Sequence, residues 1–293
     1  MLQVVANGIA AGARVLLVAV GFYLILRVAR FLNLAHAFFI TAGAYVAYAL
    51  HRLAGLPFLP ALCLAVVACG LVGGAGEAII YRPARRTASS LVLLLLSLGL
   101  YIAGQNLISL VFGDAPLVIR QWGQPTTFTL GSVTVTLGQA GTVLVALVLA
   151  CALAVFLQSS RTGRMLKAVG SNMSLARISG IHVDGLVFLA FVVGSAFAAI
   201  AGILACLEVD ATPSMGLGML MLSLVAVIAG WSWGLMGISI ISLILGVFQH
   251  LTAYFCGAQW QDVIAFAFLA AVFVLRGRRG MATLDGAAAK GQG

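Results

Sequence analysis

Few residues of this 293-residue chain have side chains that perform chemistry. The four histidines, His36, His51, His182 and His250, are far apart, and no pair has the spacing of metal ligands on a helix. The sequence holds no Walker A, H-E-x-x-H or G-x-S-x-G motif, and its five cysteines show no paired ligand spacing. We therefore predict that the chain is not an enzyme and binds no metal ion, nucleotide or other cofactor by itself.

Polar residues inside apolar stretches are the remaining candidates for a functional site. Burying a polar group in hydrocarbon is costly, so such a group should face the interior of a helix bundle or a water-filled cavity. On this argument the sequence predicts a mildly polar substrate path, with these candidate residues: Asn33, His36, Glu77, Ser97, Gln105 and Asn106.

The uncharged candidates also have structural interpretations. Asn33 precedes an apolar run and is suited to cap the helix there, with His36 at the third helical position. Gln105 and Asn106 lie in the middle of an apolar stretch, where they either hydrogen-bond a ligand or bridge two helices. The sequence leaves both alternatives open.

Two charged residues inside apolar stretches are equally ambiguous. Glu77 either contacts substrate or pairs with nearby arginines, such as Arg82 a turn and a half away. Arg14 interrupts the first apolar stretch, so its side chain must snorkel to the membrane surface or face a polar interior.

The elements that position these residues must lie in lipid. Hydrophobic residues make up 63% of the chain and charged residues only 8%, with a mean hydropathy of +1.16. Too little polar surface remains to coat a soluble globule of this size, and the composition also excludes disordered and collagen-like chains. We predict one integral membrane domain over residues 1–280, followed by a disordered Gly- and Ala-rich tail at 281–293.

Length and hydropathy predict the number of helices that cross the bilayer. A spanning helix needs about 20 mainly apolar residues. The segment at 216–232 is the weakest, and a re-entrant element is its alternative. The sequence thus predicts an all-α, polytopic transmembrane helix bundle of about nine spanning segments, near residues 5–26, 34–51, 57–80, 89–112, 138–158, 185–207, 216–232, 235–253 and 259–275.

Basic residues predict the orientation, because cytoplasmic links are enriched in Lys and Arg. An even number of predicted spans separates each of three basic groups from the next, so all three fit on the cytoplasmic side. This places the N-terminus outside and the C-terminus in the cytoplasm. The net charge of +9 is then a membrane signal, and no nucleic acid partner is expected. The three groups are Arg82, Arg85 and Arg86, then Arg161, Arg164, Lys167 and Arg177, then Arg276, Arg278 and Arg279.

Two links are longer than a connection requires. Residues 113–137 combine turn residues with an alternating TVTV stretch, which predicts a small extracytoplasmic hairpin or loop. Residues 159–184 contain two short helix-compatible pieces, RMLKAV and MSLARI, separated by GSN and followed by Gly180. This second link is the largest predicted cytoplasmic feature.

Small residues recur four positions apart along several predicted helices. Such spacing lets helix backbones approach closely, since van der Waals packing drives helix association in lipid. General bundle packing is the simpler interpretation, and a substrate passage is the alternative. The pairs are Gly8 with Gly12, Gly70 with Gly74, Gly194 with Ala198, and Gly230 with Gly234.

Four stretches resemble one family, the membrane-spanning permease subunits of bacterial ABC importers for branched-chain amino acids. FLNLAHAFFITAGAYVAY (31–48) is similar to the family's Asn-x-Ala-His signature and the Gly-Ala-Tyr after it. YRPARR with LLSLGLYIAGQNL (81–107) resembles its Arg-Pro-x-Arg stretch and next helix. TGRMLKAVGSNMSLARISGIHVD (162–184) resembles the cytoplasmic loop that docks onto the ATPase, and FVVGSAFAAIAGILA with PSMGLG resembles the helix and loop that follow.

The resemblance implies an inner-membrane importer subunit that performs no chemistry. Its implied partners are a second permease subunit, identical or homologous, two ATP-binding-cassette ATPases that bind and hydrolyse the ATP, and an extracytoplasmic solute-binding protein. The 159–184 link would be the ATPase-coupling loop, although ordinary positive-inside charge on a link is the alternative. Its predicted coupling residues are Arg161, Arg164, Met165, Leu166, Lys167, Arg177 and Ile178, with Val169 and Leu175 as further apolar contacts.

Departures from the family pattern leave the substrate open. Ala37 stands where glycine commonly follows the histidine, Gln249 stands at an often acidic position, and an expected lysine is missing after PSMGLG. Branched-chain or related small hydrophobic amino acids are the predicted substrates, and urea, amides or another small solute are the alternatives. A stand-alone secondary carrier or channel is a further alternative, for which only Glu77 and Arg14 supply intramembrane charge.

Overall fold

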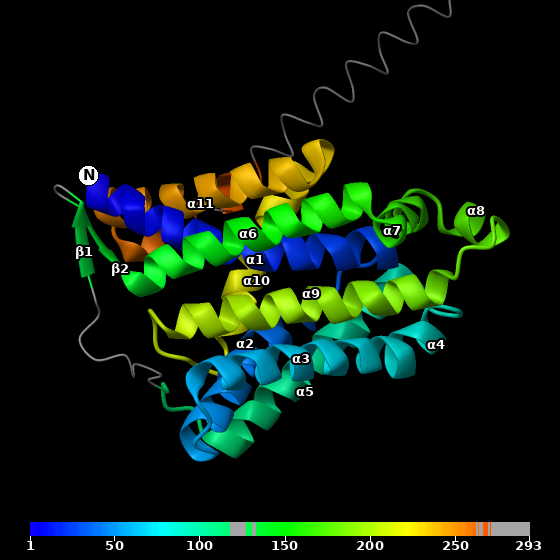
Figure 1. Ribbon diagram of the computed structural model, residues 1–293, viewed down its shortest axis with the longest axis horizontal. Helices are drawn as coiled ribbons and strands as arrows, with labels where there is room; N and C mark the ends of the chain where they lie inside the picture. Colours follow the sequence, from blue (N-terminus) through cyan, green and yellow to red (C-terminus); the bar gives the residue numbers. More distant parts are fainter. Residues whose placement is uncertain (118–126, 131–132, 262, 264–265, 269, 271–293) are drawn as a thin grey trace, which may run out of the picture.

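The protein is a helical bundle with one small β-hairpin (Figure 1). The computed structural model describes residues 1–117, 127–130, 133–261, 263, 266–268 and 270. The main helices are α1 (Leu2–Ala29), α2 (His36–Tyr48), α3 (Phe58–Gly76), α5 (Ser90–Phe112), α6 (Leu137–Ser159), α9 (Val183–Cys206), α10 (Met215–Gly230) and α11 (Gly234–Cys256). The short elements are α4 (Arg82–Ala84), α7 (Arg161–Ser171), α8 (Met173–Ile178), π-helical segments at Ala49–Leu53 and Glu77–Tyr81, and 3-10 helices at Trp231–Trp233 and Ala258–Trp260.

The described helices agree with a polytopic helical membrane protein, and the predicted count of nine spans stays a prediction. Six helical stretches in the described residues are long and apolar enough to cross a bilayer. Eight of the nine predicted segments coincide with helices, but α2 has only 13 residues, and α10 and α11 form a single apolar stretch, Met215–Cys256. The ninth segment, 259–275, and the tail at 281–293 lie mostly or wholly outside the described residues.

The predicted hairpin is present in the link between α5 and α6. Strands β1 (Thr127–Leu130) and β2 (Val133–Thr136) pair antiparallel, with Thr127 opposite Thr136. The alternating threonine and valine residues favour an extended backbone, and Thr136 then caps α6 in a reciprocal capping box with Gln139. In the part of the chain that the structure describes, this hairpin holds both named strands, and an isolated bridge joins Leu117 to Ala211.

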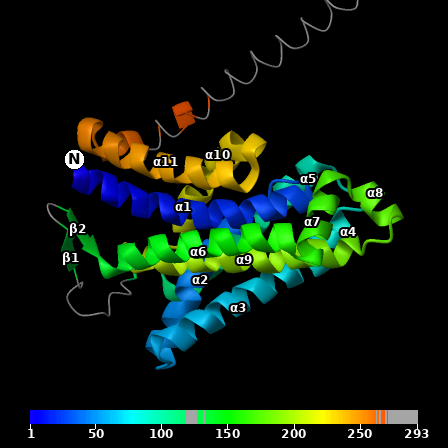
Figure 2. The same cartoon turned by 45° about the horizontal axis from the view of Figure 1, so that its top comes forward.

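Helix α1 is the centre of the bundle. It lies between α11, α6 and α9 (Figures 1 and 2), and most of its residues are buried, including the run Val15–Ile25. In contrast, α3, α5 and α6 each carry exposed leucine and valine side chains, such as Leu71, Leu95 and Leu144. Such apolar faces require lipid or another membrane protein as their surroundings.

The bundle is held by close backbone approaches at small residues. A Cβ atom added at Gly246 of α11 would lie 2.2 Å from the backbone nitrogen of Gly12. One added at Gly194 of α9 would lie 2.9 Å from the carbonyl oxygen of Gly21. Six of the seven glycines in the predicted four-residue pairs face the backbone or side chains of another helix closely, which supports the packing interpretation. Gly234 is the exception: a Cβ atom there would meet only the Tyr23 hydroxyl at 3.8 Å, and its φ of 61° shows that it serves a turn.

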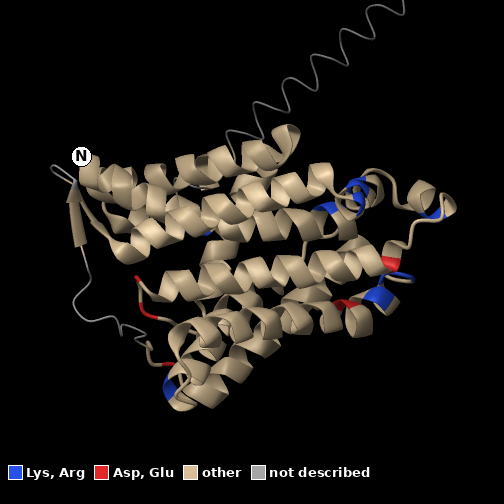
Figure 3. Ribbon diagram, in the orientation of Figure 1, with Lys and Arg blue, Asp and Glu red and all other residues tan. Residues whose placement is uncertain are grey.

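Most of the described lysine and arginine residues gather at one end of the bundle, while acidic residues lie at both ends (Figure 3). Figure 3 shows lysine and arginine at the end that carries α4, α7 and α8, which we call the basic end. The N-terminus and the hairpin lie at the opposite end, which we call the hairpin end. The first two predicted basic groups are therefore on the same side of the bundle, while the third, at 276–279, lies outside the described residues.

A paired glycine substitution tests this packing. A Cβ atom at Gly202 of α9 would lie 1.8 Å from the carbonyl oxygen of Ile40 in α2, whereas one at Gly99 of α5 would meet no atom within 4 Å. We expect Gly202→Ala to destabilise the protein by about 2 kcal/mol through overpacking. Gly99→Ala should leave it unchanged or slightly more stable, because alanine favours helix. Thermal unfolding of the purified protein measures both, and equal melting temperatures for the two variants would contradict the packing described.

Candidate functional site

The chain breaks between α1 and α2 inside the bundle. Helix α1 ends at Arg30, which has a left-handed backbone conformation with φ of 61°. The side chain of Ser97 in α5 then supports the non-helical backbone: its Oγ accepts from the Leu34 N–H at 2.9 Å and lies 3.3 Å from the Leu32 carbonyl. Buried non-helical backbone needs such partners at membrane depth. The contacts of Ser97 thus support the backbone at the break, and its role in a substrate path stays a prediction.

Asn33 lies at this break and is completely buried. Its Oδ1 accepts a hydrogen bond from the Tyr81 hydroxyl at 3.0 Å, and its Nδ2 has no partner among the described residues. The prediction that Asn33 caps α2 is wrong, because the helix begins at His36 with Ala35 as its cap and without a side-chain hydrogen bond. The Asn33 side chain points instead to the tyrosine of the neighbouring helical segment.

Several buried polar groups near α2 lack partners in the described part of the chain. His36 is fully buried 5.8 Å from the Phe22 ring, and the backbone of Val18 lies near it, but among the described residues neither ring nitrogen has a partner with good hydrogen-bond geometry. The hydroxyls of Thr41 in α2 and Ser195 in α9 are also buried without a partner. Unsatisfied buried polar groups are few in native proteins and call for an explanation. Thr41 and Ser195 were missed from the sequence, although both are hydroxyl residues inside apolar stretches.

Glu77 forms an ion pair, but with a different arginine from the one expected. Its carboxylate pairs with Arg85, while Arg82 donates to the Asp184 carboxylate of α9 at 2.9 Å. The π-helical segment Glu77–Tyr81 changes the helical register. Glu77 and Arg85, which are eight residues apart in sequence, therefore meet. Burial lowers the pKa of the Arg85 guanidinium, and the nearby Glu77 charge opposes this shift. The ion-pair interpretation of Glu77 therefore has direct geometric support.

Gln105 and Asn106 lie apart from these residues. Both belong to the second half of α5, beyond Ser97. Asn106 is exposed, and its amide donates to the Ile102 carbonyl of its own helix at 2.7 Å. Gln105 is only partly buried. The structure therefore brings Asn33, Glu77 and Ser97 to one region around the chain break, and it does not bring Gln105 or Asn106 there.

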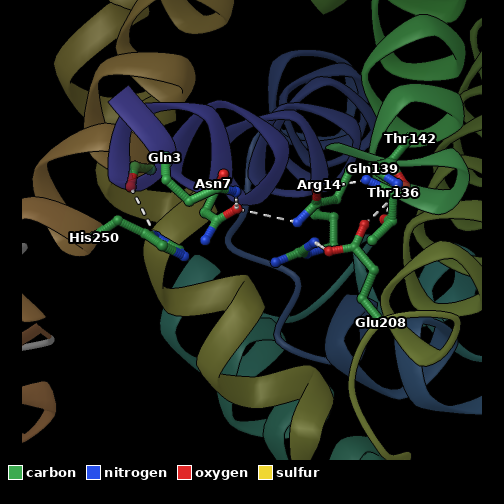
Figure 4. Close-up of polar contacts among 9 residues, drawn as sticks. Gln3, Asn7, Arg14, Thr136, Gln139, Thr142, Glu208 and His250 are labelled. Atoms are coloured by element: carbon green, nitrogen blue, oxygen red, sulfur yellow. Dashed lines mark hydrogen bonds and ion pairs between the residues drawn. The ribbon is translucent and has the colours of Figure 1, made fainter. Parts of the chain in front are cut away.

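A second polar network lies in the hairpin half of the bundle (Figure 4). Arg14 of α1 pairs with Glu208, which follows α9, and both side chains are mostly buried. The Thr142 hydroxyl lies 3.4 Å from the second Glu208 oxygen. Gln139 of α6 donates to Asn7 at 3.3 Å, which extends the network toward the N-terminus.

Arg14 therefore faces a polar interior, one of its two predicted alternatives. Its partner Glu208 was missed, although a carboxylate at the end of an apolar stretch is the natural counter-charge for an intramembrane arginine. Asp184 was missed in the same way as a partner of Arg82 and, at 3.7 Å, of Arg177. Opposite charges at similar depths in different predicted helices were the sequence signal for both ion pairs.

The predicted coupling loop contains two helices, α7 and α8, at the basic end (Figure 1). Asn172 ends α7 and caps α8 by accepting from the Leu175 N–H at 3.0 Å. Arg30, at the end of α1, donates to the carbonyls of Gly170 and Ser171 in the last turn of α7, at 3.2 and 2.5 Å. The loop is thus attached directly to the central helix.

Exposure separates the predicted coupling residues into three groups. Leu166 and Val169 are buried against the bundle, so they cannot fill a groove on another subunit, and their predicted role is corrected. Met165 and Lys167 are partly buried. The side chains exposed at this surface are Arg161, Arg164, Leu175, Arg177 and Ile178, with Ile178 84% exposed.

Comparison with known proteins identifies the family. The sequence profile described as "Branched-chain amino acid transport system / permease component" matches residues 4–273. The chain belongs to this family. The permease is also similar over nearly its whole length to named relatives.

The high-affinity branched-chain amino acid transport system permease protein LivH of Salmonella typhimurium is 28% identical, over 94% of this chain and 93% of the relative. BraD of Pseudomonas aeruginosa, which carries the same description, is 27% identical over 94% of both chains. The autoinducer 2 import system permease protein LsrC of Photorhabdus laumondii is 33% identical, but over only 45% of this chain. Among solved structures, PsaBC from Streptococcus pneumoniae in complex with Fab has a TM-score of 0.52 and 16% identity, covering 93% of this chain and 90% of that one, which supports the fold alone.

The Arg14–Glu208 pair gives a stability test of the permease. Removing one partner of a buried ion pair strands the other charge, so Arg14→Met and Glu208→Met should each destabilise the protein by about 3 kcal/mol. The double variant should recover much of this loss, because neither charge remains unpaired. Arg177→Met is the matched control: Arg177 is 65% exposed in its pair with Asp184, so we expect a change below about 1 kcal/mol. Additive losses in the double variant, measured by thermal unfolding, would contradict the pairing.

Proposed function

We propose that this permease is the membrane-spanning subunit of an ATP-binding-cassette importer in the bacterial inner membrane. Its substrates are branched-chain or related small hydrophobic amino acids, delivered by an extracytoplasmic solute-binding protein. The observation that carries the proposal is the match of the branched-chain permease profile to residues 4–273. The full-length similarity to permeases named for branched-chain amino acid transport supports the substrate class.

The proposed orientation places the basic end in the cytoplasm and the hairpin end outside. Nine spans satisfy this orientation when α2, α10 and the segment at 259–275 are counted as crossings. The clustering of lysine and arginine at one end supports it, because cytoplasmic links carry the excess of these residues (Figure 3). The hairpin then meets the solute-binding protein on the outer side.

The α7–α8 surface is the proposed contact with the ATPases. Leu175 and Ile178 lie three residues apart on α8 and are 59% and 84% exposed, a pattern suited to a hydrophobic groove on a partner. Exposed Arg164 and Arg177 add positive charge beside them. Two ATPases and a second permease subunit, identical or homologous, complete the assembly.

Motion of α7 has a direct route to the substrate path in this proposal. Arg30 connects the last turn of α7 to the end of α1, directly before the chain break that contains Asn33. A shift of α7 on ATP binding would move this break, and the partnerless groups of Asn33, His36 and Thr41 would gain water or substrate as partners in the opened state. Because the path has few charges, high affinity resides in the solute-binding protein.

Reconstituted transport tests the function. Vesicles that contain this permease with its second permease, ATPases and binding protein should accumulate leucine, isoleucine or valine only when ATP is supplied on the ATPase side. Permease-only vesicles, with or without a proton or sodium gradient, are the control and should show no uptake. Gradient-driven uptake by the permease alone would make it a secondary carrier, and ATP-driven uptake of urea or amides but not of these amino acids would overturn the substrate class.

Charge reversal tests the docking surface. We expect Arg164→Glu together with Lys167→Glu to abolish copurification of the ATPases. In this proposal the native arginine and lysine contact acidic side chains of the ATPases, and the two new carboxylates would repel those side chains. Arg52→Glu, at the hairpin end, is the control and should retain the ATPases. Immunoblotting of the membrane fraction checks that each variant inserts normally. Retained copurification with the doubly reversed surface would reject its role in docking.

A further inference from the structure

A cavity of about 710 Å³ opens at the basic end between α1, α5, α8 and α9. Its walls combine charged and apolar side chains. The proposed transport function uses Arg177 at the docking surface and Arg30 as the connection to α7, but it assigns no ligand to this cavity, and α7 does not contribute to its lining. The charged lining residues, which define the arginine cavity, are Arg30, Arg82, Arg85, Arg86, Arg177 and Asp184.

The positive charge of the arginine cavity exceeds the negative charge that faces it. Arg82 and Arg177 share the single carboxylate of Asp184. Arg30 donates to backbone carbonyls, and among the described residues neither it nor Arg86 has an ion pair. Even with the Glu77 charge that pairs with Arg85, the cluster keeps a net positive charge.

Two buried donors in this cluster also lack acceptors. Arg82 Nε and Arg85 Nη1 are inaccessible to solvent and form no hydrogen bond in the described chain. A buried donor without an acceptor costs free energy, and the cost is larger for a charged group. Both atoms are inaccessible, so they do not face the open cavity as it stands, and the excess positive charge of the lining is what favours an anion with several acceptor oxygens.

The rest of the lining favours an anionic group attached to an apolar body. Ser90 lies in the first turn of the 23-residue helix α5, whose N-terminus attracts negative charge. Leu93 and Val183 add apolar walls. Leu91 and Leu95 lie on the exposed face of the same helix, 65% and 56% exposed, where an acyl chain would contact them.

We propose that the arginine cavity binds a phosphate group, carried by an anionic phospholipid of the cytoplasmic leaflet or present as a free phosphate. Guanidinium groups match phosphate oxygens with paired N–H donors. Basic pockets between membrane helices on the cytoplasmic side are suited to phospholipid headgroups. Binding there would join the ends of α1, α5 and α9 through one ligand, next to the chain break of the substrate path.

Native mass spectrometry of the purified full-length permease tests the proposal. The protein is incubated with phosphatidylglycerol or with phosphatidylcholine, and in a separate arm inorganic phosphate is titrated by calorimetry. Preferential retention of phosphatidylglycerol without binding of free phosphate assigns the lipid source, and saturable binding of inorganic phosphate assigns the free ion. Equal retention of both lipids together with no phosphate binding would overturn the proposal.

Substitution of Arg86 locates the site. Arg86 is exposed and has no ion pair in the described chain, so Arg86→Gln should fold normally and weaken binding about fivefold. Arg86→Lys should recover part of the affinity because it keeps the positive charge. The recovery should be incomplete because lysine lacks the paired N–H donors of arginine. Arg161→Gln removes an exposed arginine outside the cavity and should bind as the unmodified protein does.

Unchanged binding in Arg86→Gln, or an equal loss in Arg161→Gln, would place the phosphate elsewhere and overturn the assignment. If Arg86→Gln releases the ATPases while phosphate and lipid binding stay unchanged, the cavity receives an acidic side chain of the partner instead. Each readout is made on the purified protein without transport, so the site stands or fails separately from the proposed import function.

Discussion

The architecture of this protein depends on the close approach of helix backbones at glycine. In lipid the exclusion of water does not drive helices together, so their contact surfaces must fit by shape. Gly12 and Gly246 bring α1 against α11, and Gly21 and Gly194 bring α1 against α9. With three elements fixed in this way, the polar side chains of α1 and the residues that follow it face the interior instead of lipid.

This packing allows the chain to break inside the bundle. The segment after Arg30 is not helical, and it is stable because Ser97 and Tyr81 on neighbouring elements supply hydrogen bonds. Arg30 joins the same segment to the last turn of α7. One short stretch of chain therefore connects the candidate docking surface with the partnerless polar groups of the candidate path.

Most of the helices could be predicted from hydropathy, and the hairpin from its alternating threonines, because each is encoded locally. The interactions between elements could not. The partner of Glu77 is Arg85 because a π-helical segment alters the helical register, and nothing in the local sequence pattern indicates that change of register. Leu166 was expected to face a partner, but the side of α7 that packs on the bundle depends on where α9 and α1 lie. The Asn33 side chain accepts a hydrogen bond from Tyr81, 48 residues later in the chain, instead of capping α2.

ATP-driven import by this permease requires the α7–α8 end to lie in the cytoplasm, where an ATPase can reach it. Single cysteines at Ser179, after α8, and at Thr129, in β1, are placed in a chain from which the five native cysteines have been removed. In intact cells a membrane-impermeant maleimide should label the Thr129→Cys protein and should label Ser179→Cys only after the membrane is permeabilised. Labelling of the position after α8 from outside intact cells would contradict this orientation and the proposed contact with the ATPases.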